Sequence, residues 1–229
     1  MTGATKPVRT AIALLSGGLD SVVAAASFLE NGGRIARCLT FDYGQRASAR
    51  EAEVAQRFCA ARALPWELVS LPWLMRASQL AGSALVDASR SMPHGTLAVP
   101  GDQASASAVW VPARNCVFLA IAAAFAEAEG ADVVLAGFNR EEAATFPDNS
   151  EAFVRAAGEF LGKGTRAGVT VQAPVQHLDK RGIVALARRL SIARDELWSC
   201  YEGGMEPCGR CESCLRSERA WALVGTGGP

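Results

Sequence analysis

The sequence predicts an α/β fold with a doubly wound, mainly parallel five-stranded sheet and a small C-terminal metal-binding segment. Three observations predict it. Short apolar runs alternate with segments of helical spacing, a glycine-rich turn follows the first apolar run, and four cysteines gather near the C-terminus. The chain has 229 residues, of which 50% are hydrophobic, enough for one sizeable core.

The first part of the chain alternates strands with helices. A glycine pair at 32–33 and Pro65 mark the two helix ends, since neither residue type continues a helix well. Such alternation implies parallel strands joined by right-handed crossovers. The expected elements are a strand at 11–15, a helix at 20–31, a strand at 37–41, a helix at 45–64 and a strand at 66–71.

The pattern fails between residues 72 and 111, which contain prolines, glycines and several serines. A segment this long without clear elements is typical of a lid or an insertion. Regularity returns with a helix that has Pro112 in its first turn and Gly130 at its end. The remaining expected elements are helices at 112–129, 151–161 and 180–190, and strands at 133–136 and 169–173.

Charge and composition narrow the class of function. Lys and Arg number 23 and Asp and Glu number 23, so the basic excess typical of nucleic-acid-binding domains is missing, and we expect a small-molecule substrate. The start of the chain is polar and broken by Pro7, and no apolar run approaches the ~18 residues that cross a bilayer. Seven cysteines in such a chain favour thiols or metal ligands over disulfides. We expect a cytoplasmic protein without membrane or nucleic-acid partners; a homodimer is left open.

In a parallel α/β sheet, ligands bind at the carboxyl ends of the strands, where the helix N-termini also gather. The most unusual local sequences of the chain fall on this edge. They are residues 16–21, 42–46, 114–115, 139–149 and 179–180.

The strongest of these segments is S-G-G-L-D-S at 16–21, between the first strand and its helix. Its glycines allow a tight turn, and its hydroxyls and the helix N-terminus offer donors to an anion. An ordinary glycine-rich turn is the alternative, which the full motif disfavours. The motif is neither G-x-x-x-x-G-K nor G-x-G-x-x-G, and it resembles the PP-loop of ATP pyrophosphatases. That resemblance implies that the loop holds the pyrophosphate of ATP, with magnesium expected beside Asp20. The expected contacts are Leu15, Ser16, Gly17, Gly18, Leu19, Asp20 and Ser21.

The second strong signal is a set of cysteines spaced as two overlapping C-x-x-C steps with one cysteine eight residues upstream. Four thiolates in this spacing suit tetrahedral zinc, and four protein ligands leave no open position, so the site is expected to be structural. An iron–sulfur cluster or a redox pair is the alternative. Cys38, Cys59 and Cys116 are expected to be buried bystanders. The predicted ligands are Cys200, Cys208, Cys211 and Cys214.

Other candidates on this edge carry weaker signals. Arg114 stands in the first turn of a helix, where the dipole disfavours a basic residue, so a functional cause is favoured over a structural one. Lys163 and Lys180 are interpreted either as surface charges or as phosphate contacts. The two histidines show no pairing pattern that would suggest catalysis.

Taken together, the motifs resemble the 7-cyano-7-deazaguanine synthases of queuosine and archaeosine biosynthesis, within the PP-loop ATP pyrophosphatases. The resemblance covers nearly the whole chain. It implies an adenine-nucleotide-hydrolase-like catalytic domain over residues 1–197, with a lid or insertion at 72–111, and a zinc segment over 198–229. The motifs are L-S-G-G-L-D-S at 15–21, F-D-Y-G-Q-R at 41–46, V-P-A-R-N at 111–115, F-P-D at 146–148, Asp-Lys at 179–180, W-S-C-Y at 198–201 and C-G-R-C-E-S-C at 208–214.

The family's chemistry implies that ATP adenylates the carboxylate of 7-carboxy-7-deazaguanine, that ammonia gives an amide, and that a second ATP gives the nitrile. Catalytic roles would fall on Asp20, Arg46, Arg114 and Lys180, and a further phosphate contact on Lys163. Substrate contacts would fall on Tyr43, Gln45, Arg114, Asn115 and Asp148.

The chain departs from the family pattern near the implied substrate pocket. Ala47 replaces a histidine of many bacterial members, Asn149-Ser150 replaces Cys-Arg, and Glu142 stands where aspartate is common. A related PP-loop ligase that joins the deazaguanine carboxylate to another amine, such as a protein amine, is therefore an alternative. Two further alternatives are a tRNA-thiolating enzyme, which the charge balance disfavours, and a nucleotide sensor without turnover, which the intact PP-loop motif disfavours.

Overall fold

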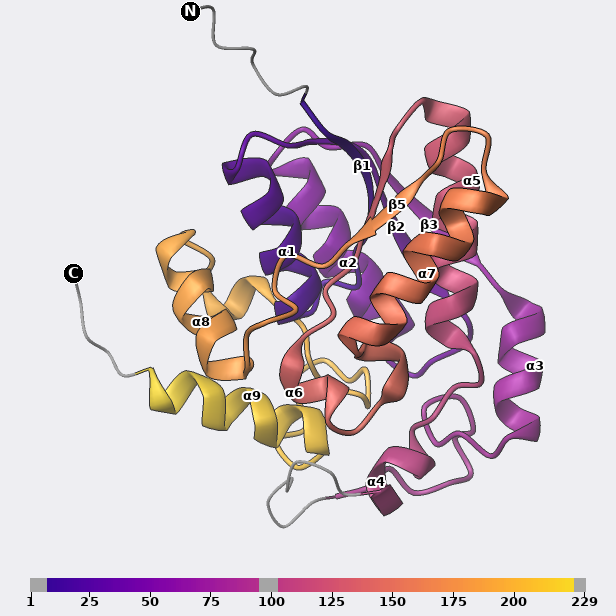
Figure 1. Cartoon of the computed structure of the whole chain (residues 1–229). Coiled ribbons are helices and arrows are strands. Elements are labelled where there is room, and N and C mark those ends of the chain that lie inside the picture. The colour runs from indigo at the N-terminus through magenta and orange to yellow at the C-terminus, as the bar shows by residue number, and fades with distance from the viewer. Residues whose placement is uncertain (1–7, 95–102, 225–229) are drawn as a thin grey trace, which may run out of the picture.

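The computed structural model describes residues 8–94 and 103–224, and side chains from residue 106 on in the second range (Figure 1). Its centre is a five-stranded sheet in the order β3-β2-β1-β4-β5, with every pairing parallel. The predicted parallel α/β fold is confirmed. The strands are β1 (Thr10–Leu14), β2 (Arg34–Asp42), β3 (Trp66–Ser70), β4 (Val133–Leu135) and β5 (Thr170–Gln172).

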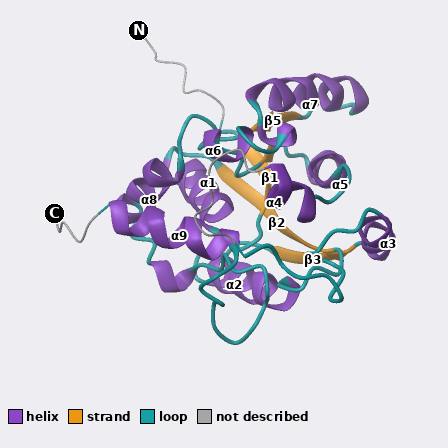
Figure 2. Ribbon diagram, turned by 90° about the horizontal axis from the view of Figure 1, so that it is seen from below, coloured by secondary structure: helices purple, strands orange, loops and turns teal. Residues whose placement is uncertain are grey.

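Helices cover both faces of the sheet (Figure 2). The helices α1, α2 and α8 lie on one face, with α9 packed against α8, and α5 and α7 lie on the other. Side chains of β1 alternate between the two layers: Ala11 and Ala13 enter one core, and Ile12 enters the other. The principal helices are α1 (Leu19–Glu30), α2 (Ser48–Ala60), α5 (Arg114–Glu129), α7 (Glu151–Gly164), α8 (Lys180–Arg189) and α9 (Glu212–Leu223).

The strand order creates a crevice. The chain builds β1, β2 and β3 toward one edge and then returns to place β4 and β5 on the other side of β1. Loops that follow β1 and β4 therefore diverge at the carboxyl ends of these neighbouring strands, which is where doubly wound folds bind ligands. The glycine-rich turn and residues 137–149 meet at this switch point.

Two parts of the chain contain helices that the pattern did not predict. Residues 72–111 were expected to lack clear elements, but they include α3 (Pro72–Leu80) and α4 (Gln103–Ala108). The part of that segment at 95–102 lies outside the described residues. The cysteine segment ends in α9, which was not expected either. Three short elements complete the fold: α6 (Arg140–Ala143), η1 (Pro147–Asn149) and η2 (Arg194–Glu196).

The cysteine segment packs closely on the rest of the described fold. The Trp198 amide donates to the Gly17 carbonyl at 3.0 Å, so the start of the segment is bonded to the glycine-rich turn. An isolated antiparallel β-bridge between His94 and Cys211 joins the cysteine segment to the part of the chain before α4. Over the described residues, none of the helices has the length and apolar character that a membrane span needs.

Candidate active site

The glycine-rich turn forms an open anion cradle between β1 and α1. Ser16 and Ser21 lie with their Oγ atoms 3.2 Å apart, and Ser21 Oγ also donates to the Gly18 carbonyl at 3.1 Å. Gly17 has φ +76°, and a Cβ there would lie 2.9 Å from Val54, so this position requires glycine. Within the described chain, no side chain caps the start of α1, which leaves its first N–H groups available to an anion.

The cradle lines two cavities of about 230 Å³ each, which share part of their lining. Both are lined by Ser16, Gly18, Asp20 and Arg114. We call the first cavity the polar lobe and the second the apolar lobe. The polar lobe is further lined by Asn139, Glu142, Asp148, Lys180 and Arg216, and the apolar lobe by Leu39, Phe41, Phe118 and Phe138.

A row of alternating charges runs along the polar lobe. Lys180 Nζ bonds the Asp20 carboxylate and lies 3.2 Å from Glu142 Oε1. Glu142 Oε1 also accepts from Arg216 at 3.0 Å, and Arg216 pairs in turn with Glu212. The row therefore links the N-terminus of α1 to α8, to α6 and to α9, the helix that contains Cys214.

Burial and neighbouring charges shift the pKa values along this row. Burial raises the pKa of Asp20 above its usual range, although Lys180 opposes the shift. For Lys180, burial lowers the pKa, but Asp20 and Glu142 outweigh it and the pKa ends above the ordinary lysine value. The lysine is thus firmly cationic. Asp20 Oδ1 is buried and has no hydrogen-bond partner among the described residues, so it is free to meet a ligand or a cation.

Arg114 stands where the two lobes meet. Its Nη1 lies 3.3 Å from the Tyr43 hydroxyl, and the next residue, Asn115, donates to the Asp148 carbonyl at 3.2 Å. Burial raises the pKa of the Asp148 carboxyl, with Arg114 pulling in the opposite direction. The preceding Ala113 has φ +53°, a left-handed conformation that is uncommon for alanine and that sets the start of α5. These contacts place a guanidinium and a carboxyl group on the wall of the polar lobe.

Three predicted site residues lie elsewhere. Arg46 pairs with Glu202 at 2.8 Å and bonds the carbonyls of Asp87 and Arg90, and as far as the structure describes the chain it lines neither lobe. Gln45 is equally absent from the described lining. Its Nε2 instead donates to Glu51 Oε2 at 2.8 Å, and Glu51 lines both lobes.

Lys163 is also separated from the cleft. It is exposed in the last turn of α7, which leads into the start of β5 and so lies at the amino end of the sheet. Helices that cross over run antiparallel to the strands, which places their C-terminal turns far from the ligand-binding edge. Apart from the four cysteines, the remaining predicted site residues either line a lobe or, like Gly17, shape the turn beside it.

The polar lobe contains residues to which no role could be assigned from their sequence motifs alone. Asn139 and Glu142 belong to a segment expected on this edge, but their side-chain directions had no signal in the sequence. Tyr201 and Arg216 come from the cysteine segment, whose helix was not predicted. Trp110 belongs to the segment expected to be a lid; the tryptophan directly before V-P-A-R-N was a usable signal for this position.

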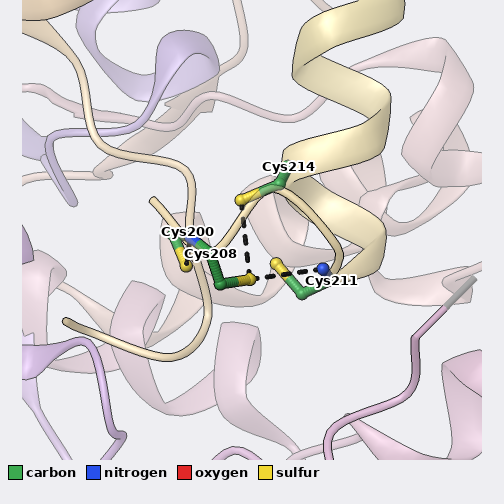
Figure 3. Close-up of side chains that lie close together, drawn as sticks. All are labelled: Cys200, Cys208, Cys211 and Cys214. Atoms are coloured by element: carbon green, nitrogen blue, oxygen red, sulfur yellow. Dashed lines mark hydrogen bonds between the residues drawn. The ribbon is translucent and has the colours of Figure 1, made fainter. Parts of the chain in front are cut away.

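The four predicted cysteine ligands converge (Figure 3). Their sulfur atoms all lie within 4.8 Å of one another, and those of Cys208 and Cys214 are 4.0 Å apart. Four sulfurs bound to zinc at ~2.3 Å in a tetrahedron would be about 3.8 Å apart, so the cluster fits a tetrahedral metal. Of the three other cysteines, Cys38 and Cys59 are buried as expected, whereas Cys116 is exposed, so that expectation was wrong.

A parallel sheet with an S-G-G-x-D-S cradle at its switch point defines a PP-loop protein, a class of nucleotide-dependent α/β enzymes. The family model "Queuosine biosynthesis protein QueC" matches residues 10–225. The chain belongs to this family.

Curated relatives named 7-cyano-7-deazaguanine synthase match over nearly their whole length. The relative from Pelotomaculum thermopropionicum is 45% identical, covering 93% of this chain and 97% of the relative. The relative from Bdellovibrio bacteriovorus is 43% identical, with 95% and 94% covered, and that from Methanosarcina mazei is 40% identical, with 96% of each covered.

Proposed function

We propose that this protein is a 7-cyano-7-deazaguanine synthase, which converts 7-carboxy-7-deazaguanine and ammonia to the nitrile at the expense of two ATP. One observation carries the proposal: the phosphate cradle opens into two lobes at once, with Arg114 at their junction. An adenylating enzyme needs this geometry, because the α-phosphate of ATP has to meet a second substrate. The family and the named relatives agree with the assignment.

The two lobes suit the two substrates. Leucine and phenylalanine side chains of the apolar lobe suit the adenosine, and the cradle with the α1 N-terminus suits the triphosphate. The polar lobe then receives the deazaguanine, with its carboxylate toward Arg114 and its donor-rich edge toward Asp148. Tyr43 accepts a hydrogen bond from Arg114, and Asn115 donates one to the Asp148 carbonyl, so these contacts help to hold Arg114 and Asp148 in place.

The proposed chemistry proceeds in two rounds. In the first round, a carboxylate oxygen attacks the α-phosphorus, pyrophosphate leaves, and ammonia then displaces AMP from the acyl adenylate to give the amide with loss of a proton. In the second round, the amide oxygen attacks a second α-phosphorus, pyrophosphate leaves again, and loss of AMP and of both amide protons gives the nitrile. Lys180 and Arg114 line the polar lobe, and we propose that they stabilise negative charge on the transferring phosphoryl group.

Two metal ions belong to the proposal. Magnesium would balance the charge of the triphosphate, and Asp20 Oδ1, which has no protein partner among the described residues, is the oxygen available to it. Zinc would occupy the cysteine cluster as a structural ion, since four thiolates leave no open coordination position.

We propose a positioning role for Arg46 and Gln45 and no phosphate contact for Lys163. The cytoplasmic location and the homodimer stay predictions.

Mass analysis of the products from ATP, ammonia and 7-carboxy-7-deazaguanine tests the proposal. We expect 7-cyano-7-deazaguanine together with two AMP and two pyrophosphate per nitrile, and no product from Asp20→Ala. ADP as the dominant nucleotide would contradict the adenylation mechanism. An adduct with a different amine, and no nitrile, would identify the related ligase instead.

A further inference from the structure

One carboxyl group of the cleft has no part in the chemistry proposed so far, although that chemistry needs a proton acceptor. Displacement of AMP by ammonia releases a proton from nitrogen, and formation of the nitrile releases both amide protons. Glu51 lines both lobes, whereas Glu142 and Asp148 belong to the described lining of the polar lobe alone. A residue on the shared lining is close to the place of reaction, because the α-phosphate of ATP has to meet the second substrate there.

Glu51 also differs from the other carboxyl groups of the cleft in its partners. Asp20 is bonded to Lys180, and Glu142 lies between Lys180 and Arg216. A cation this close stabilises the charged form of a carboxylate and so makes it a weak proton acceptor. Over the part of the chain that the structure describes, Glu51 belongs to no ion pair.

Gln45 holds one oxygen of Glu51 in place. The Gln45 Oε1 accepts from the Tyr43 amide at 3.0 Å, and its Nε2 donates to the Phe41 carbonyl at 2.9 Å and to Glu51 Oε2 at 2.8 Å. These bonds use the carbonyl oxygen and both N–H groups of the side-chain amide, which fixes its orientation. Glu51 Oε1 has no hydrogen-bond partner among the described residues, so it is available to receive a proton.

We propose that Glu51 is the general base that takes the protons leaving the substrate nitrogen. The proposal rests on the proposed function for the identity of the reaction. In the first round, ammonia bonds to the acyl carbon, Glu51 takes one N–H proton, and the bond from this carbon to the AMP oxygen breaks, with its electron pair leaving on AMP. In the second round, Glu51 takes the two N–H protons of the adenylated amide in turn, the carbon–nitrogen bond becomes triple, and AMP leaves in the same way. Each proton passes on to water before the next transfer.

The surroundings of Glu51 suit a proton acceptor. Burial raises the pKa of Glu51 above the ordinary glutamate value, and the carboxylate of Asp42 adds to the shift. The hydrogen bond from Gln45 and the charge of Arg114 oppose it. Burial also raises the pKa of the neighbouring Tyr43, so this hydroxyl stays neutral. A carboxylate accepts a proton more effectively as its pKa approaches the working pH.

The test separates adenylation, which needs no base, from the nitrogen steps, which do. Exchange of labelled pyrophosphate into ATP, with 7-carboxy-7-deazaguanine and without ammonia, measures adenylation, and mass analysis after addition of ammonia measures amide and nitrile. In Glu51→Gln, whose side-chain oxygen can still accept from Gln45, exchange should be unchanged and amide formation should slow roughly 100- to 10,000-fold. Glu53→Gln is the matched control on α2, since Glu53 pairs with Arg50 and is absent from the described lining of both lobes, and it should keep both activities.

Glu51→Asp distinguishes proton transfer from packing. Aspartate changes the shape of the side chain more than glutamine does but keeps a carboxylate, so this variant should form amide faster than Glu51→Gln. The reverse order would overturn the base, as would a wild-type rate of nitrile formation in Glu51→Gln. A Glu51→Gln protein that loses exchange as well, or that no longer folds by its melting temperature, would give Glu51 a structural role instead. In each of these cases the function stands if the unaltered protein makes the nitrile. Absence of exchange with 7-carboxy-7-deazaguanine in the unaltered protein would overturn the function and the base together.

Discussion

Asn139 is fully buried, and only one of the two polar groups of its side-chain amide has a hydrogen-bond partner among the described residues. Its Oδ1 accepts from the Glu142 amide at 3.0 Å and so caps α6, while its Nδ2 has no hydrogen-bond partner in the described part of the chain. A buried donor left unpaired costs about 1–3 kcal/mol. Since Asn139 lines the polar lobe, an oxygen of a bound phosphate or carboxylate would satisfy this donor.

Asn139→Ser separates the two functions of this residue. Serine caps a helix about as well as asparagine, so stability should change by less than about 0.5 kcal/mol, whereas loss of the donor should lower kcat roughly 10- to 1000-fold. The control is Ser150→Ala, which removes the cap of α7 and should cost about 1 kcal/mol of stability without loss of activity. Wild-type turnover in Asn139→Ser would contradict a ligand contact.

At the scale of elements, the loop after β4 touches the first turn of α1 through Gly137. A Cβ at this position would lie 2.6 Å from the Ser21 amide nitrogen and 2.7 Å from the Asp20 carbonyl carbon. Both neighbours are backbone atoms and cannot turn aside. Because Gly137 has no side chain, the two loops at the switch point can approach each other this closely.

Gly137→Ala should push the cradle out of position and raise the Kd for ATP at least 10-fold, by calorimetry, because α1 has to shift to relieve the contact. Gly158→Ala is the matched control. It lies within α7, where a Cβ would meet only the Val171 nitrogen at an ordinary 3.7 Å, so it should stabilise the protein by about 0.5–1 kcal/mol and leave ATP binding intact. Equal ATP affinity in both variants would contradict the idea that the close contact at Gly137 positions the cradle for ATP.

The strands and the main helices could be predicted because apolar periodicity and glycine or proline stops agreed along the chain. Helix α3 was missed although Pro72 begins it and Gly82 follows it, because nearby prolines and serines suggested an irregular segment. The position of Arg46 after β2 predicts that its loop lies at the carboxyl edge of the sheet, but it does not predict where the side chain points, and the guanidinium pairs with Glu202. Lys163 lies in the last turn of α7, at the end of the sheet opposite the ligand-binding edge.

At the scale of the whole molecule, the cysteine segment is a wall of the active cleft. It contributes Tyr201, Ser213 and Arg216 to the polar lobe. Cys211 is the N-cap residue of α9, the helix that carries Ser213 and Arg216. A metal ion bound at the cysteines would therefore hold part of the polar lobe in place. The sequence predicted the metal ligands from their spacing, but the contact between this segment and the cleft depends on tertiary packing, which spacing does not encode.

Removing the metal with a chelator should loosen this wall and leave the α/β core folded. Structural zinc contributes ~10 kcal/mol in small metal-folded units, but the large core here is stable by its own packing. Hydrogen exchange should lose protection over 198–223, far-UV circular dichroism should change little, and nitrile formation should stop. Cys211→Ser should behave like the stripped protein. Cys116→Ser, at an exposed cysteine outside the cluster, should keep both metal and activity; full metal occupancy in Cys211→Ser would refute the assignment.

The row of alternating charges also limits how this protein can evolve. Glu142 stands between Lys180 and Arg216, and its loss alone would leave two buried cations facing each other. Loss of Arg216 alone would leave Glu142 and Glu212 without the cation that separates them. We therefore expect substitutions at 142 and 216 to be tolerated together more readily than singly. Among descendants of a common ancestor, an acidic residue at 142 and a basic residue at 216 should be inherited as a pair.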